Sequence, residues 1–133
     1  MDTFHEGFTK IRLSYDQPYI TLSNRTLSFS KSAIDMLERT PCVHVSISKE
    51  KKELLVEACE PDTFSVQFVR EVPPGRQVLV RWTNRILLDP IRELAGIPRN
   101  SEPVRIWGEF YPEYKAIKFD LTDNQPINYW SSD

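Results

Sequence analysis

The fold is decided by the stretch Asn84-Arg85-Ile86-Leu87-Leu88-Asp89-Pro90-Ile91-Arg92-Glu93-Leu94-Ala95-Gly96-Ile97. Its apolar residues predict a short strand over Ile86-Leu87-Leu88 and then a short helix. Asp89 is a good N-cap because its carboxylate accepts a backbone N–H, and Pro90 suits the first helical position. Gly96 predicts the end of the helix. The next apolar run, from Val104 to Leu121, alternates around a central turn and predicts a hairpin.

The same plan occurs earlier in the chain. Asn24-Arg25-Thr26-Leu27-Ser28-Phe29 again contains a turn and a strand, and Ser30 predicts the cap of a helix over residues 31–39. An alternating run from Cys42 to Cys59 follows. We therefore predict two copies of a strand-strand-helix-hairpin unit, with equivalent corners about 60 positions apart.

Residues 1–133 are expected to form a single domain built from these repeats, over residues 19–59 and 78–121. Residues 60–77 join the repeats, and their clearest loop is Val72-Pro73-Pro74-Gly75-Arg76. Residues 122–133 are predicted to be a tail.

Alternation also predicts how the first hairpin pairs. A tight turn at Glu50-Lys51 places six apolar residues on one core face, as an antiparallel pair with one solvated face requires. The predicted pairs are Ile47–Leu54, Val45–Val56 and Val43–Ala58. The same register puts Cys42 opposite Cys59 on the outer face. Two unbridged thiols are expected there, and a redox-sensitive pair is the alternative.

Alternation predicts the pairing of the second hairpin as well. A turn at Pro112-Glu113 again gives a continuous core face. The predicted pairs are Phe110–Lys115, Gly108–Ile117, Ile106–Phe119 and Val104–Leu121.

Charge and composition limit the class of protein. The chain has 17 basic and 19 acidic side chains and a formal charge of −2, so a nucleic-acid surface must be a local basic patch. No apolar run reaches the roughly 18 residues that span a bilayer, and the N-terminus lacks a signal-peptide layout. We expect a cytoplasmic protein with reduced Cys42 and Cys59.

The sequence contains no recognisable enzyme motif. It lacks a phosphate-cradling glycine loop, GxSxG and HExxH, and its two cysteines and two histidines are not spaced as zinc ligands. We therefore expect no catalytic activity, metal or cofactor.

The order of elements resembles the AbrB/MazE/SpoVT-type swapped-hairpin DNA-binding domain. That family's pattern is Gly-Arg, a short apolar strand, Pro-Lys, a helix and Leu-Gly-Ile. Asn84-Arg85 here stands for Gly-Arg and Ala95-Gly96-Ile97 for the helix end. In the first repeat Asn24-Arg25 and Lys31 fit, while Ser30 replaces the proline. Family DNA contacts carry over only to Arg25, Lys31 and Arg85.

The resemblance implies that this chain carries both halves of a barrel that two family chains build together. A four-stranded unit of about 45 residues buries little apolar surface alone, so two units should share one core. We expect a mainly β, β-rich α+β fold: a pseudo-two-fold barrel with two short helices. The chain would be a monomer with pseudo-symmetry or a homodimer.

Arginines in the two equivalent turns are the best candidates for contacts with double-stranded DNA, because a guanidinium group holds phosphates or reads guanine. The predicted DNA-binding residues are Arg25, Lys31, Arg81, Arg85 and Arg92. The alternative is that they are solvated, or paired with Glu93 and Asp35.

Aromatic residues suggest a second function. Trp107 is opposite in phase to the core residues of its strand, so it should face outward beside Tyr111, and Tyr129 and Trp130 lie in the tail. The first hypothesis is a small DNA-binding transcriptional regulator. The alternative is a protein-binding module, such as an antitoxin-like or inhibitor protein from a phage or mobile element, that uses these four aromatics.

Overall fold

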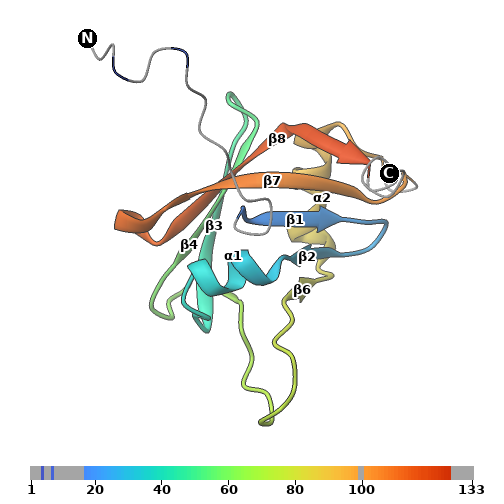
Figure 1. The fold of residues 1–133 in the computed structure, drawn as a ribbon. Helices are drawn as coiled ribbons and strands as arrows, with labels where there is room; N and C mark the ends of the chain where they lie inside the picture. Colours follow the sequence, from blue (N-terminus) through green and yellow to red (C-terminus); the bar gives the residue numbers. More distant parts are fainter. Residues whose placement is uncertain (1–3, 5–6, 8–16, 99–100, 127–133) are drawn as a thin grey trace.

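A computed structural model describes Phe4, Gly7 and residues 17–98 and 101–126. The fold is mainly β, as expected: eight antiparallel strands form one open, curled sheet in the order β5-β3-β4-β8-β7-β1-β2-β6 (Figure 1). The elements are β1 (Tyr19–Leu22), β2 (Leu27–Phe29), α1 (Lys31–Met36), β3 (Cys42–Ser48), β4 (Glu53–Ala58), β5 (Val66–Gln67), β6 (Arg81–Trp82), α2 (Arg85–Ala95), β7 (Val104–Tyr111), the 3₁₀ turn η2 (Pro112–Tyr114) and β8 (Ala116–Pro126).

The first helix begins where the sequence predicts and ends earlier. The Ser30 side chain caps α1 by accepting the Ala33 N–H at 3.2 Å. The helix stops at Met36 because Glu38 and Arg39 take left-handed backbone angles, with φ of 57° and 52°. An α-helix cannot continue through such residues, so the predicted end at residue 39 is wrong.

The β3–β4 hairpin confirms the predicted register. Val43 lies opposite Ala58, Val45 opposite Val56 and Ile47 opposite Leu54. Strict alternation and a short turn leave only one register that buries the apolar face.

The β7–β8 register differs from the prediction by two residues. Gly108 lies opposite Phe119 and Phe110 opposite Ile117. The connection is longer than a tight turn, because η2 is followed by Lys115 in the left-handed region, with φ of 49°. A bulge between Ile106 and Gly108 shifts the pairing again, and β8 runs on to Pro126. The predicted tail therefore loses residues 122–126 to the sheet.

The second helix starts earlier than the sequence suggests. Asn84, not Asp89, is the N-cap, and its side-chain oxygen accepts the Ile86 N–H at 2.9 Å. Residues 86–88 are therefore helical, and the predicted strand there is wrong. Pro90 lies inside α2. The segment from Val78 to the helix holds one strand, β6, where the predicted repeat has two.

Helical burial explains this outcome. Leu88 and Ile91 are spaced to share one helix face and are almost fully buried against the sheet. A strand over 86–88 would present alternate residues to the core instead. Gly96 ends the helix with φ of 69°, as predicted.

One core joins both parts of the chain. Phe29 from the first half makes edge-to-face contacts with Trp82 and Phe119 from the second, at ring-centre distances of 4.8 and 6.3 Å. Phe119 itself is fully buried. Neither helix in the described part of the chain is long and apolar enough to cross a bilayer.

Candidate functional site

A pocket of about 650 Å³ lies between the β1–β2 turn and one side of α2. The turn is tight, since the Ser23 N–H donates to the Thr26 oxygen at 2.9 Å. The α2 residues that line the pocket are three or four positions apart, so they lie on one side of the helix. The turn contributes Asn24, Arg25 and Thr26, the helix contributes Arg85, Leu88, Asp89 and Arg92, and Thr83 completes the lining. We call this the arginine pocket.

Arg92 ties the turn to the helix. Arg92 as a whole is 5% exposed, and its Nη2 donates to the backbone oxygens of Asn24, at 2.6 Å, and of Ser23. The predicted direct DNA contact does not suit this burial. Arg92 holds the β1–β2 turn in place, and so brings Arg25 to the same pocket as Arg85.

Arg25 and Arg85 are both exposed at the pocket. Among the described residues, no carboxylate forms an ion pair with either guanidinium. Asp35, one of the carboxylates suggested as a partner, pairs with Arg39 at 3.3 Å. Asp89 is the one carboxylate among the described lining residues, against three arginines, so the pocket carries excess positive charge.

The other predicted basic residues lie elsewhere. Arg81 lines an adjoining groove together with Arg70, and Thr83 borders both hollows. Lys31 lines a smaller pocket, with Asp35, Arg39 and Arg76. The structure thus brings Arg25, Arg85 and Arg92 together, places Arg81 next to them and leaves Lys31 apart.

The sequence did not predict the adjoining groove, which has a volume of about 740 Å³. It lies where the two edges of the sheet approach each other, so we call it the seam groove. Arg70 carries no local signal in the sequence, because its neighbours across the groove come from residues 79–87. Only the curl of the sheet brings these segments together.

The outward aromatics pack against their own sheet. Trp107 is half-buried and makes an edge-to-face contact with Tyr19 at 5.0 Å. The Arg105 guanidinium lies 4.1 Å from the Tyr19 ring centre. The Lys118 ammonium lies 5.1 Å from the Tyr111 ring centre. Tyr129 and Trp130 fall outside the described residues.

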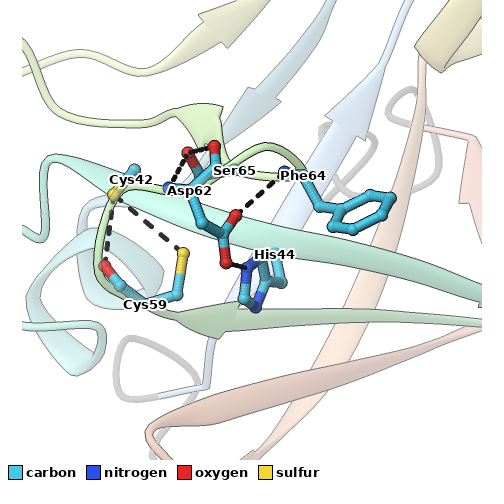
Figure 2. Close-up of polar contacts among 6 residues, drawn as sticks. All are labelled: Cys42, His44, Cys59, Asp62, Phe64 and Ser65. Atoms are coloured by element: carbon cyan, nitrogen blue, oxygen red, sulfur yellow. Dashed lines mark hydrogen bonds and ion pairs between the residues drawn. The ribbon is translucent and has the colours of Figure 1, made fainter.

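Figure 2 shows a polar cluster around β3 and the loop after β4. Cys42 and Cys59 are free thiols whose sulfur atoms lie 4.0 Å apart, and the Cys42 thiol donates to the Cys59 oxygen at 3.1 Å. Burial, with the neighbouring Cys42, raises the pKa of Cys59 to about 11. Such a thiol is a poor nucleophile at neutral pH.

The same cluster contains a histidine–carboxylate pair. His44 Nε2 lies 2.7 Å from Asp62 Oδ2, and Asp62 Oδ1 accepts the Phe64 N–H at 2.9 Å. The hydrogen bond from His44 is the main cause that lowers the pKa of Asp62. No group of three or more His, Cys, Asp or Glu side chains among the described residues is arranged to hold a metal ion.

Comparisons with protein-family models, curated proteins and solved structures found no match for this chain.

Proposed function

We propose that this chain is a DNA-binding regulator that holds the phosphate backbone of double-stranded DNA at the arginine pocket. The observation that carries the proposal is the convergence of Arg25 and Arg85, from two distant segments, on one pocket with no ion pair to a described carboxylate. A guanidinium without an acidic partner is available to a phosphate, which it can bind with two hydrogen bonds.

The mechanism is mainly electrostatic. Arg25 and Arg85 would neutralise neighbouring phosphates, and Arg81 would extend the contact past Thr83. Phosphate contacts orient a protein on the duplex but read no sequence, so any specificity needs base contacts beyond them. Asn24 and Thr26, which lie beside Arg25 in the lining, are polar residues able to supply these.

We further propose that the two halves are diverged copies of a swapped-hairpin unit. The two hairpins lie side by side through the antiparallel β4–β8 pair, in which Leu54 lies opposite Phe119 and Val56 opposite Ile117. An antiparallel contact between the two hairpins is the arrangement that a two-fold relation between copies would produce, and it supports this proposal. One chain would then supply both halves.

The test is binding to random-sequence double-stranded DNA, measured by fluorescence anisotropy at about 50 and 200 mM salt. The wild type should bind more weakly at the higher salt. The Arg25→Ala/Arg85→Ala variant should bind more weakly still, with a salt slope smaller by about two, because each lost phosphate contact removes about 0.9 from the slope.

A matched control separates the pocket from net charge. Lys49→Ala/Lys51→Ala removes the same charge from the exposed tip of the β3–β4 hairpin. This variant should keep the wild-type slope. The proposal fails if the wild type does not bind at low salt, or if both double variants lose affinity equally.

A further inference from the structure

The two ends of the open sheet approach each other without pairing. β5 and β6 are its edge strands, each two residues long. The Trp82 indole N–H donates to the Gln67 backbone oxygen at 3.1 Å and so links the edges by a side chain. The seam groove lies at this link.

The residues that lead through β6 form an extended edge. Burial alternates from Leu79 to Thr83, with Val80 and Trp82 buried and the other three exposed. On one side this segment pairs with β2: Leu27 lies opposite Trp82, and the Phe29 N–H donates to the Val80 oxygen at 3.1 Å. On the other side of the backbone, no strand of the described residues is a neighbour. Edges of this kind accept an added strand.

Two large apolar side chains are exposed to solvent at the groove. Ile86 is 86% exposed and Leu79 is 66% exposed, and both line it. Buried Phe68 and Trp82 lie beside them in the same lining. Large apolar side chains gathered in a groove, rather than scattered singly, are typical of an interaction site.

Charge complements this apolar surface. Arg70 and Arg81 are exposed at the groove, and none of its described lining residues is acidic. The lining also includes Val66 and Leu87, and these apolar side chains offer nothing to the phosphates of a duplex. An extended peptide can use both features, because its side chains alternate between two faces and its backbone bonds to the edge.

We propose that the seam groove binds an extended, acidic segment of a partner protein, which adds as a strand along the free edge of β6. Its apolar side chains pack on Leu79 and Ile86, and its carboxylates meet Arg70 and Arg81. The inference does not depend on DNA binding: Arg81 is the one groove residue that it shares with the proposed DNA contact, and neither Arg25 nor Arg85 lines this groove.

The experiment screens the full chain against a displayed library of random peptides of about 12 residues, long enough for a strand of ordinary length. We expect enriched peptides that combine acidic residues with alternating apolar ones. Synthetic copies should lose about tenfold or more in affinity for Leu79→Ser/Ile86→Ser, the loss expected when a central interface contact is removed. Arg81→Glu should weaken acidic peptides and favour basic ones.

A control variant and a second measurement show whether the peptides bind at the groove. Tyr114 is 69% exposed and outside the groove, so Tyr114→Ser should bind the peptides like the wild type. Hydrogen exchange with a bound peptide should slow at the amides of residues 79–83. Peptides that bind all variants equally, or a library that yields no sequence above background, would overturn the proposal. So would loss of DNA binding in Leu79→Ser/Ile86→Ser, which would place the groove within the nucleic-acid surface.

Discussion

The Arg92 guanidinium donates to the backbone oxygen of Asn24, 68 positions earlier in the chain, at 2.6 Å. This contact joins α2 to the β1–β2 turn and forms one wall of the arginine pocket. A buried cation that satisfies carbonyl groups is a structural element, and its removal should affect both stability and the site.

Replacing Arg92 with Met should therefore lower the free energy of unfolding by about 1.5–3 kcal/mol, the usual contribution of a hydrogen bond made by a charged group. DNA affinity should fall as well, because the turn that carries Arg25 is no longer held. Urea unfolding and anisotropy titrations measure the two effects. Arg85→Met, at an exposed position, should lower affinity without lowering stability. A fully stable Arg92→Met variant would contradict this role.

Gly108→Ala should destabilise the sheet. A Cβ atom at residue 108 would lie 2.7 Å from Ile117 Cγ2 and 2.7 Å from Phe119 Cε1, both in fully buried side chains. Overpacking of this kind typically costs about 1–3 kcal/mol. Thermal and urea unfolding should show the loss, while Glu109→Ala, at the exposed neighbour, should behave like the wild type. Equal stability of the two variants would show that the strand can shift to make room.

Cys59 should react slowly with iodoacetamide. With its pKa raised to about 11 by burial and by Cys42, about 1% of the thiol is ionised at pH 9. Because the raised pKa favours the protonated form in the folded state, its contribution to stability is present below pH 9. That contribution is lost as the pH rises towards 11.

Alkylation followed by mass spectrometry of proteolytic peptides gives the rate at Cys59 separately from Cys42. The rate should rise steeply between pH 9 and 11 in the folded protein and become much faster in urea. Rapid labelling of folded Cys59 at pH 8 would disprove the high pKa and favour a redox-active pair.

The His44–Asp62 pair should influence stability at low pH. The pKa of Asp62 is lowered chiefly by the His44 hydrogen bond, so the ionised carboxylate is favoured in the folded state. This contribution is present above the ordinary carboxyl pKa and is lost as the pH falls through the lowered value.

His44→Ala should raise the pKa of Asp62, as measured by ¹³C NMR of its carboxyl carbon. Ser46→Ala, at an exposed position two residues along β3, should leave that pKa unchanged. An unaltered titration in His44→Ala would assign the shift to the backbone N–H groups of the turn.

Local patterns predicted much of the sheet. The β3–β4 register is right because a change of one residue would put Val45 and Val56 on opposite faces, one of them towards solvent. The predicted β7–β8 register is wrong by two residues. The pattern did not exclude it, because a shift of two residues keeps Gly108 and Phe110 on the same face. Only the length of the turn distinguishes the two registers, and Pro112-Glu113 does not reveal that Lys115 adopts a left-handed conformation.

The start of α2 shows a different limit. Asn84 and Asp89 are both good N-caps, and the sequence favoured Asp89 because Pro90 follows it. The helix begins after Asn84 because this start lets Leu88 and Ile91 be buried together. That burial depends on the surface of the sheet, which the local sequence does not describe.

The sequence by itself determined the alternating strands, the caps at Ser30 and Gly96, and the choice of Arg25 and Arg85 as candidates. These follow from local sterics and hydrogen bonding within a few residues. Only the tertiary structure decided that the two arginines share a pocket, that Arg92 is buried beneath the turn, and that Arg70 and Arg81 border one groove. These relationships depend on how far the sheet curls and on where α2 packs, and both are settled by burial of one common core.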